Sequence, residues 1–427
     1  MDPKKILLLG GLAVVTLVLI ILLAAAVFLR GGQAVTLTYW GLWEPEAIYQ
    51  TVIPDFQKTH PKVTIKYLKQ SPQNYGSRLA TALAGNSSPD IVRLHNTWVG
   101  NLKNYLSPAP ASIFTNSSFK NTFYPVAASD LIVNSQILAV PLEYESLALY
   151  VNEDILRSSG REVPTIWDGD SGFLATARKL TVKDSNNRII TSGAAMGTAS
   201  NTDHWQDILS LMMLQAESNL TKNPGSDQAA GALNYYAAFA TGDRTWDETL
   251  ENSTLAFANG KVAMYFGPSW RYFDLKAINP NLNFKIYPVP QLAGGTTVNF
   301  ASYWAEAVSK KSPNQKIAWE FVQFLSSKDT LAKLYAAEAN LRGFGEPYSR
   351  KDMASLLTAD PNVGVFISGA PTAKSWHLSS FTSDGETGIN SRIGKYYLDA
   401  VNSVIRGTDA KSALTTVASG VNQVLNK

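Results

Sequence analysis

A long apolar run dominates the start of the chain. Ile6 to Leu29 holds 24 consecutive residues without a charge. As a helix this run would be about 36 Å long, enough to cross the ~30 Å hydrocarbon core of a bilayer. Lys4 and Lys5 precede it, which favours a cytoplasmic N-terminus, whereas Ala24-Ala25-Ala26 would suit cleavage of a signal peptide. We expect residues 1–34 to be a membrane anchor, or else a cleaved signal, that leaves the rest outside the cytoplasm.

Beyond this segment, strand-like and helix-like patterns alternate. Apolar side chains occupy every second position in 35–39 and 63–67, which predicts strands, and apolar residues four apart in 75–83 share one face of a helix. A helix interrupted by Pro54 separates the two strands, and a short buried strand is predicted at 90–94. This β-α-β-α-β order predicts a parallel sheet with crossover helices. Further strands are predicted at 147–151, 283–287 and 305–309, and further helices at 203–215, 229–240, 312–325 (opened by the capping box Ser312-Pro313-Asn314-Gln315) and 393–405.

Length and composition are typical of a globular protein with more than one domain. The chain has 427 residues, and at roughly 100–200 residues per domain this length suggests two or three domains. Hydrophobic residues make up 45% and charged residues 17%, which favours packed cores over disorder. Neither repeats nor a clear linker interrupt the sequence, so we expect the domains to exchange strands.

Charge and residue usage exclude several classes of function. The net charge is +3, and residues 1–34 contribute three basic residues against one acidic residue, which leaves 34 against 33, or +1. This balance does not favour a nucleic-acid partner. The chain has no cysteine, which excludes disulfides, thiolate metal ligands and a Cys nucleophile. The four histidines lack metal-binding spacings, so we expect neither a metal site nor a cofactor.

Seven local motifs occur along the chain in an order that resembles a known family. They are 37–41 leading to 56–61, Ser88-Pro89-Asp90-Ile91, 139–142 followed by 147–154, Pro164-Thr165-Ile166-Trp167, 257–264 followed by Trp270, Pro288-Val289-Pro290, and 318–325. The most specific is Phe257-Ala258-Asn259-Gly260-Lys261-Val262-Ala263-Met264. Together, over residues 36–425, they resemble the extracellular solute-binding proteins of the family that includes maltose-binding protein.

The resemblance implies a fold, a function and partners. The fold is α/β, a two-lobed periplasmic-binding-protein-like fold of type II with lobes joined by crossing strands, here preceded by one N-terminal transmembrane helix. By analogy, lobe one comprises 35–142 plus 293–345, and lobe two comprises 143–292 plus 346–427. A small polar solute, most often a sugar, is then held between lobes that close by a hinge. The expected partners are ABC permease subunits with a cytoplasmic ATPase, and the chain is expected to act as a monomer and not as an enzyme.

Candidate ligand-binding residues follow from strand ends and from the family motifs. Open α/β sheets bind ligands beyond the carboxyl ends of their strands. Aromatic rings suit the apolar faces of sugars, and carboxylates, amides and guanidinium groups suit their hydroxyls. The selected residues are Trp40, Trp43, Glu44, Tyr75, Asn96, Trp98, Glu143, Tyr144, Trp270, Arg271, Tyr303, Trp304 and Arg342. Core, hinge or surface roles are the alternatives. His204-Trp205 and Trp376-His377 are further candidates from lobe two, for which a core role is favoured over a ligand-binding one.

Alternative functions and ligands stay open at this point. Glu143 and Glu145 would share one face of a strand about 7 Å apart, which permits a glycosidase pair, although nothing else supports hydrolysis. Gly169-Asp170-Ser171-Gly172 spells a serine-protease signature without its partners. A surface receptor that signals without an importer is a third possibility. Ten Trp and eighteen Tyr favour a sugar, while glycerol phosphates and polyamines are also bound by related proteins.

Overall fold

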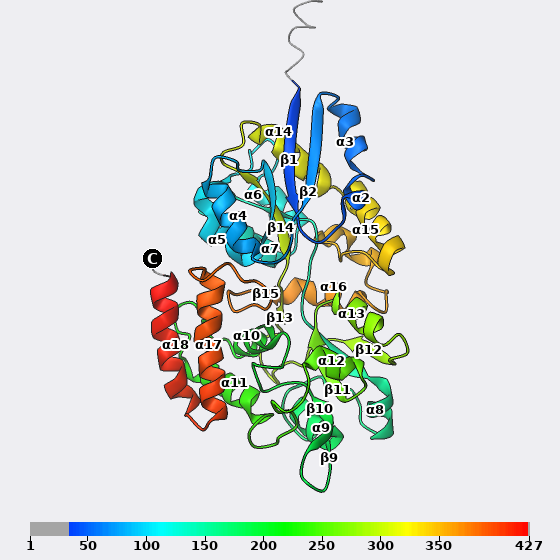
Figure 1. Ribbon diagram of the computed structural model, residues 1–427, viewed down its shortest axis with the longest axis vertical. Helices are drawn as coiled ribbons and strands as arrows, with labels where there is room; N and C mark the ends of the chain where they lie inside the picture. Colours follow the sequence, from blue (N-terminus) through cyan, green and yellow to red (C-terminus); the bar gives the residue numbers. More distant parts are fainter. Residues whose placement is uncertain (1–33, 426–427) are drawn as a thin grey trace, which may run out of the picture.

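The computed structural model describes residues 34–425, which fold into two α/β lobes arranged end to end (Figure 1). Each lobe has its own central sheet and its own hydrophobic core. The chain enters the first lobe through β1 and ends in a pair of helices on the second lobe. The space between the lobes is therefore bounded by two separately packed bodies.

The first lobe is built on a sheet with the strand order β2-β1-β3-β14-β4, in which β7 also pairs with β14. β1 is parallel to β2 and β3, which confirms the predicted parallel sheet, and β14 is antiparallel to all its partners. Its core joins strand residues such as Val92 to helix residues such as Leu79 and Trp319. The strands are Val35–Gly41 (β1), Val63–Lys69 (β2), Ile91–His95 (β3), Leu106–Ser107 (β4), Val140–Pro141 (β7) and Trp304–Ser309 (β14), beside the small hairpin Ile132–Val133 (β5) and Gln136–Ile137 (β6).

The second lobe is built on a sheet with the order β12-β8-β11-β10-β9. β10 and β11 are parallel, and β8 is antiparallel to both β11 and β12. The C-terminal helices Ile389–Ile405 (α17) and Ala410–Leu425 (α18) pack together beside Asp227–Ala238 (α11) (Figure 1). The strands are Ala148–Asn152 (β8), Val182–Lys183 (β9), Ile189–Ala194 (β10), Val262–Gly267 (β11) and Phe284–Tyr287 (β12).

Helices surround both sheets. In the first lobe they are Glu46–Tyr49 (α2), Ile53–Thr59 (α3), Tyr75–Ala84 (α4), Val99–Leu102 (α5), Asn116–Thr122 (α6), Pro125–Leu131 (α7), Gln315–Leu325 (α14) and Lys328–Arg342 (α15). After β8 the chain forms Glu153–Ser158 (α8), Phe173–Leu180 (α9), Trp205–Gln215 (α10), Asp227–Ala238 (α11), Ser253–Ala258 (α12) and Arg271–Ile278 (α13). The last helices are Gly364–Gly369 (α16), Ile389–Ile405 (α17) and Ala410–Leu425 (α18).

The segments that cross between the lobes pair with one another. Glu143 forms an isolated antiparallel bridge with Tyr348, and Ser146 forms one with Ala301. A two-stranded parallel sheet, Asn299–Phe300 (β13) with Ala373–Lys374 (β15), lies in the same region (Figure 1). The hinge region is thus a narrow band of hydrogen-bonded backbone. We therefore expect the lobes to move about this band as whole bodies.

One local prediction is wrong, because the residues of the expected capping box serve a different purpose. α14 begins at Gln315, and no side chain caps its first turn. The Ser312 hydroxyl donates instead to Asp90 Oδ1 at 2.5 Å, and Gln315 Oε1 accepts a hydrogen bond from Ser107 at 2.7 Å. These contacts join the ends of β3 and β4 to the turn after β14. Long-range contacts therefore replaced the helix cap that the local sequence favours.

Pro54 does not interrupt a helix. The predicted helix is divided into α2 and α3 before the proline, and Pro54 lies in the first turn of α3. A proline is tolerated there because first-turn amides have no partner within the helix. The buried residues Tyr49, Val52 and Phe56 still pack toward the first core. The predicted apolar face is therefore correct, although the break lies at a different residue.

The N-terminal prediction falls outside the described residues. Within residues 34–425, no helix has the length and apolar character needed to cross a membrane. The predicted anchor, residues 1–34, lies outside the described residues except for its last position and stays a prediction. The lobe limits also stay predictions, although the buried side chains of Tyr348, Met353 and Ile367 pack with the first core and not the second.

Candidate functional site

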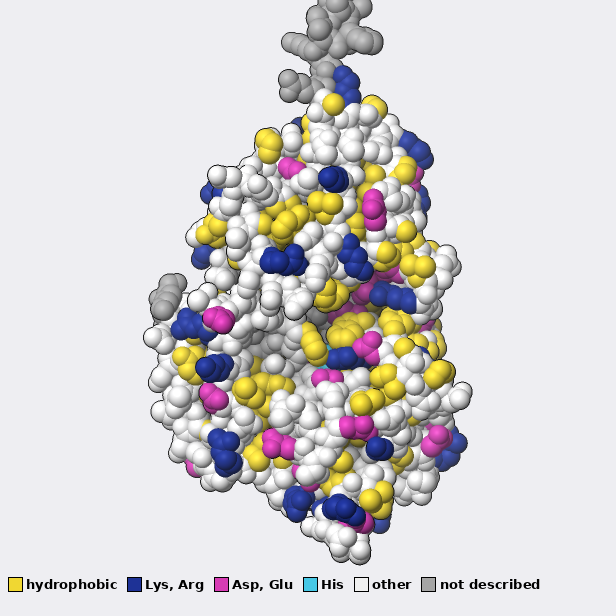
Figure 2. Space-filling view, in the orientation of Figure 1, with side chains coloured by type: hydrophobic (Ala, Val, Ile, Leu, Met, Phe, Trp, Pro, Cys, Tyr) yellow, Lys and Arg dark blue, Asp and Glu magenta, His cyan; other side chains and the backbone are white. Residues whose placement is uncertain are grey.

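A cavity of about 470 Å³ lies between the two lobes. Figure 2 shows the surface hollowed there, with hydrophobic, basic and acidic side chains around the opening. Both lobes and the crossing segments contribute, so a molecule in the cavity would contact all three. The lining residues are Trp43, Pro72, His95, Glu143, Glu145, Ser146, Leu147, His204, Asp207, Pro268, Trp270, Arg271, Phe300, Ser302, Trp304, Arg342, Glu346, Ser380, Phe381 and Thr382.

Two tryptophans form the wall on the first lobe. Trp43 lies in the loop after β1 and is 41% exposed, and Trp304 is the first residue of β14. Their ring centroids are 5.6 Å apart and their planes meet at 77°. Trp98 and His95 pack against Trp304, with centroids 5.2 and 5.3 Å away. Trp304 is therefore held by the core, whereas Trp43 offers an open apolar face of the kind that suits a sugar ring.

Trp270 and Phe381 form the opposite wall on the second lobe. Trp270 precedes α13, and Phe381 lies in the loop before α17 with a φ of 60°. A left-handed conformation is rare for a bulky residue, which indicates that the surrounding loop fixes this ring. Their centroids are 6.0 Å apart. The guanidinium carbon of Arg271 lies 4.4 Å from the Trp270 ring centroid and 5.0 Å from that of Phe381, so the cation binds both aromatic faces.

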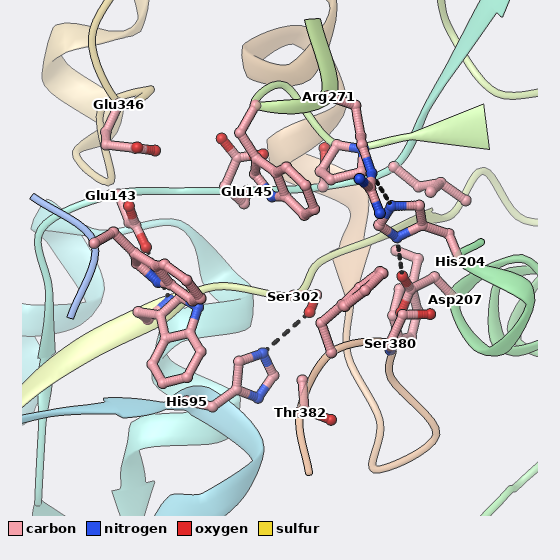
Figure 3. A pocket seen from close by; sticks show the side chains of 18 of the residues that line it. His95, Glu143, Glu145, His204, Asp207, Arg271, Ser302, Glu346, Ser380 and Thr382 are labelled. Atoms are coloured by element: carbon pink, nitrogen blue, oxygen red, sulfur yellow. Dashed lines mark hydrogen bonds and ion pairs between the residues drawn. The ribbon is translucent and has the colours of Figure 1, made fainter. Parts of the chain in front are cut away.

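His204 links this wall to the interior of the second lobe (Figure 3). Arg271 Nε donates to His204 Nε2 at 3.0 Å, so the ring proton lies on Nδ1, which contacts Asp207 Oδ2 at 3.0 Å. Asp207 Oδ1 accepts from the backbone N–H of Ser380 at 2.8 Å. Burial lowers the pKa of His204, and Arg271 lowers it further while Asp207 opposes both. His204 is therefore a neutral positioning group for Arg271.

A second histidine begins a chain of hydrogen bonds across the hinge. His95 ends β3, and its Nε2 lies 3.0 Å from the hydroxyl of Ser302 (Figure 3). The Ser302 hydroxyl lies 2.8 Å from that of Ser379 in the second lobe. Burial lowers the pKa of His95 to about 3, so this ring is neutral. The contacts join the first lobe, a crossing segment and the second lobe at the floor of the cavity.

Paired charges form the acidic end of the cavity. Arg93 forms ion pairs with Glu44 at 2.7 Å and with Glu143 at 2.8 Å, and all three side chains are buried. Arg342 pairs with Glu346 at 2.5 Å. Burial raises the pKa of Glu143, and the charge of Arg93 only partly opposes this rise. Glu143 and Glu346 face the cavity from this cluster, as Figure 3 shows.

The same cluster offers oxygen atoms in a pattern that a metal ion can use. Carboxylate oxygens of Glu44, Glu143 and Glu346 lie within 4.8 Å of one another. They border a small second cavity of about 20 Å³, which has room for one water molecule. Arg93 already forms ion pairs with two of the three carboxylates. The Arg93 guanidinium therefore already supplies positive charge to these carboxylates. The three carboxylates alone do not favour a metal ion.

Glu145 differs from its neighbours in the groups that its carboxyl oxygens contact. Its two oxygens accept hydrogen bonds from the backbone N–H of Ser269, at 3.0 Å, and from the Ser269 hydroxyl. Among residues 34–425, no Lys or Arg forms an ion pair with it. Glu145 is 3% exposed yet lines the cavity. Burial raises its pKa to about 8, Glu346 adds to the rise, and the Ser269 hydrogen bonds and Arg342 oppose it.

The structure divides the residues predicted from the sequence into two groups. Trp43, Glu143, Trp270, Arg271, Trp304 and Arg342 meet at the cavity. Trp40, Glu44, Tyr75, Asn96, Trp98, Tyr144 and Tyr303 lie outside its lining, and all but the half-buried Trp40 are buried. Several of these use their polar atoms within the protein. Tyr303 and Asn96 both donate to Asp130, at 2.9 and 2.8 Å, and Tyr75 donates to the Arg93 carbonyl at 2.6 Å.

Sequence reasoning did not select several residues that line the cavity. His95 immediately precedes the selected Asn96. The expectation that the residue after the strand lines the cavity was therefore wrong by one position. Glu145 shares a strand face with Glu143, a signal that was available. His204 was expected to be core; it is indeed buried, but it also lines the cavity. Ser302 and Phe381 lie in segments without a periodic pattern, and no local signal marks them.

Known proteins share this architecture. The family model for bacterial extracellular solute-binding proteins matches residues 51–362. A Brucella abortus protein named as a binding protein is 21% identical over 371 residues, which cover 83% of this chain and 86% of the relative. The sugar-binding protein MalE of Xanthomonas citri superposes with a TM-score of 0.73 at 18% identity, covering 92% of this chain and 97% of MalE.

A further similar structure is the GacH receptor of Streptomyces glaucescens, which was solved without ligand and with acarbose. Its TM-score is 0.69 at 20% identity, and the match covers 93% of this chain and all of the receptor chain. These structural likenesses establish the two-lobed fold. The family model covers more than two thirds of the sequence. This protein therefore belongs to the family of bacterial extracellular solute-binding proteins.

Proposed function

We propose that this chain is the solute-binding subunit of an ABC importer and captures a sugar or oligosaccharide between its lobes. The observation that carries the proposal is a cavity whose opposite walls are aromatic and come from different lobes. Structural relatives with the same fold include the sugar-binding MalE and the acarbose-binding GacH receptor. Membership of an extracellular family places the binding domain outside the cytoplasm.

The walls suit the two kinds of surface that a sugar presents. Trp43 and Trp304 on one side, and Trp270 on the other, offer faces for the apolar sides of the ring. Glu145 and Ser302 on the crossing segments offer oxygen atoms for its hydroxyl groups. Contacts to both lobes give the ligand more binding energy in the closed form than in the open form. That difference is what drives closure.

The hinge must allow both capture and release. The crossing segments supply backbone pairing at Glu143–Tyr348 and Ser146–Ala301, which preserves the connection while the lobes rotate. The Ser302–Ser379 contact is a single hydrogen bond between two hydroxyl groups, either of which can be the donor. Such a bond contributes only about 0.5–1.5 kcal/mol, so opening does not require a large loss of contacts at this point.

The remaining elements of the proposal concern the setting of the protein. The apolar run in residues 1–33 would tether the binding domain to the membrane as a single-pass anchor, beside permease subunits that a cytoplasmic ATPase drives. The two lobes would be 35–142 plus 293–345 and 143–292 plus 346–427. The chain would work as a monomer, since one chain supplies both walls of the cavity.

A thermal-shift screen against mono- and oligosaccharides tests the ligand class. A ligand that binds only the native state stabilises it by RT ln(1+[L]/Kd), about 2.7 kcal/mol at a hundredfold excess over Kd. Small-angle scattering on the strongest hit should show a smaller radius of gyration with ligand than without. Saccharides that neither raise the melting temperature nor change the scattering would contradict the proposal.

A further inference from the structure

Acidic side chains outnumber basic side chains in the lining of the cavity. Among residues 34–425, four carboxyl groups line it against two guanidinium groups. The acids are Glu143, Glu145, Asp207 and Glu346, and the bases are Arg271 and Arg342. The remaining ionisable side chains of the lining are His95 and His204, both buried and both with a lowered pKa. The cavity therefore contains more acidic than basic groups.

Both guanidinium groups are already engaged by carboxylates of the protein. Arg271 contacts Asp274 at 2.8 Å and Asp203 at 3.5 Å, while it also stacks on aromatic rings. Arg342 contacts Glu346 at 2.5 Å and Glu338 at 3.4 Å. Among the described residues, no uncommitted cation lines the cavity to receive a phosphate or carboxylate of a ligand. The lining thus disfavours an anionic solute.

We infer that the solute carries a protonated amine, which binds at the Glu145 end of the cavity. This inference rests on the proposed function, because it takes the cavity as the solute site. An isolated carboxylate in a buried position is costly unless a cation or hydrogen bonds compensate it. Glu145 has the hydrogen bonds from Ser269 but forms no ion pair with a cation among residues 34–425. An ammonium group of the ligand supplies that cation and uses the remaining acceptor capacity of the carboxylate.

The aromatic walls are compatible with the same chemistry. Cations bind to the faces of Trp and Phe rings, and Arg271 already does so on Trp270 and Phe381. Ser269, which holds Glu145, immediately precedes Trp270 in the chain. A carboxylate and an aromatic face therefore meet at the start of α13. The shared ligand chemistry is an ammonium group on a hydroxylated or aliphatic carrier, as in an amino sugar or a polyamine.

Binding of an amine should change the protonation of Glu145. In the empty cavity the pKa of Glu145 is about 8, because burial and Glu346 raise it while Ser269 and Arg342 lower it. Buried tyrosines, Tyr144 and Tyr150, lie close by and stay neutral in this range. An ammonium group favours the ionised carboxylate, so its binding releases close to one proton at pH 6.5 and less than one proton as the pH approaches 8. The affinity for the amine should then rise as the pH rises toward 8.

A matched set of three sugars tests the inference on the full chain. Glucose, 6-amino-6-deoxyglucose and glucose 6-phosphate differ only in the group on carbon 6, which is neutral, cationic and anionic respectively. The chain is purified in a polyoxyethylene detergent, which carries neither sugar nor amine, and titrated calorimetrically at pH 6.5, 7.5 and 8.5. We expect the amino sugar to bind at least tenfold more tightly than glucose at pH 7.5, and the phosphate to bind most weakly. Two buffers of different ionisation enthalpy report the released proton.

Two variants separate charge from packing. Glu145→Gln keeps the shape of the side chain and can still accept from the Ser269 N–H, and it should reduce the preference for the amine to less than threefold and abolish proton release. Asp227→Asn removes one charge from the exposed start of α11, far from the lining, and should leave the preference unchanged. Melting temperatures without ligand check that both variants fold. An unchanged preference in Glu145→Gln would overturn the inference.

Maltotriose and spermidine extend the panel and distinguish failure of the charge inference from failure of the sugar assignment. Tight binding of glucose or maltotriose with no gain from the amine would overturn the amine inference and leave the proposed function intact. Tight binding of spermidine, with no binding of any sugar, would support the amine inference and contradict the assignment of a sugar as the ligand. If none of the five compounds binds at 10 mM, both the inference and the proposed function fail.

Discussion

Arg271 and His204 are joined by a hydrogen bond from Nε to Nε2 of 3.0 Å, although the two residues begin different helices of the second lobe. The bond fixes the proton of His204 on the nitrogen that faces Asp207. It also holds the guanidinium group between the rings of Trp270 and Phe381. The wall on this lobe is therefore one connected unit, and the loss of any member should affect the others.

Removing the indole from this unit should weaken ligand binding without unfolding the protein. Trp270 is only partly buried, so Trp270→Ala should lower the free energy of unfolding only slightly. The substitution removes an aromatic face of the cavity and the ring on which Arg271 stacks. We expect the affinity for the ligand found by screening to fall tenfold or more, measured by calorimetry. The melting temperature without ligand should stay within a few degrees of the parent. Equal affinity in both proteins would remove Trp270 from the site.

Two other tryptophans should separate binding from stability. Trp43 is 41% exposed at the cavity, so Trp43→Ala should lower affinity severalfold and leave the free energy of unfolding nearly unchanged. Trp319 is fully buried in α14, and Trp319→Ala should cost about 3–5 kcal/mol of stability because it leaves a void. Urea unfolding and calorimetry on both variants provide the comparison. A stable Trp319→Ala, or a Trp43→Ala with unchanged affinity, would contradict the assignment.

Arg93 should be among the most sensitive positions for stability. It is 2% exposed and pairs with Glu44 and Glu143, so Arg93→Met leaves two buried carboxylates without their cation. Breaking a buried pair in this way costs about 3–5 kcal/mol. The matched control is Arg178→Met, which breaks the exposed pair with Asp243 and should cost about 0–1 kcal/mol. Similar urea midpoints for the two variants would show that the charge of Arg93 does not stabilise the fold through the buried carboxylates.

The stability of the empty protein should fall between pH 6.5 and 8.5. Burial raises the pKa of Glu145 and of Glu338 to about 8 and that of Glu306 to about 7. In this window the folded state binds more protons than the unfolded state, whose carboxyl groups are already ionised, so the free energy of unfolding decreases as the pH rises. Each such group contributes at most about 1.4 kcal/mol per pH unit.

The buried histidines oppose this trend only at the lower end of the window. Burial lowers the pKa of His95, His204 and His377, so each of them raises the free energy of unfolding until the unfolded chain has lost its histidine protons, about one pH unit above the ordinary pKa of 6.5, and has no further effect at higher pH. Urea unfolding at pH 6.5, 7.5 and 8.5 measures the slope, and Glu145→Gln should make it less steep. A free energy of unfolding that rises across this range would show that the carboxyl groups are ionised throughout.

The last prediction concerns the N-terminal segment. Deleting residues 1–34 should give a soluble, folded binding domain, because both central sheets and both hydrophobic cores lie within residues 35–425. Circular dichroism and a cooperative thermal transition would test folding, and size-exclusion chromatography would test solubility. Persistent aggregation of the shortened chain would indicate that the segment does more than anchor.

Local patterns were sufficient to predict most elements of the fold. The alternation in 35–39 and 63–67 identified β1 and β2, because one buried face per strand leaves a period of two in the sequence. The order of strands and helices then predicted a parallel sheet, which β1, β2 and β3 form. The place of β14 was not predictable in this way, since its antiparallel pairing with β3 joins segments about two hundred residues apart.

The site was harder to predict than the fold. Trp43 and Trp270 were identified because a strand end and a family motif marked them, but the same strand-end rule also selected Trp98, which packs in the core. Ser302 and Phe381 contribute through crossing and loop segments whose positions depend on the packing of both lobes. Tyr303 was selected beside them, yet its hydroxyl binds Asp130, a partner 173 positions away. A local sequence window contains no information about such a partner.

The position of β14 within the first sheet also constrains how the protein is made. β14 lies between β3 and β4, yet the chain synthesises it only after every strand of the second sheet, the last of which ends at Tyr287. A chain that emerges N-terminus first outside the cytoplasm can therefore complete the second sheet while the first sheet still lacks a central strand. Nascent β3 would meanwhile expose an unpaired edge. A chaperone that shields this edge until residue 309 has emerged would raise the yield of correctly folded protein.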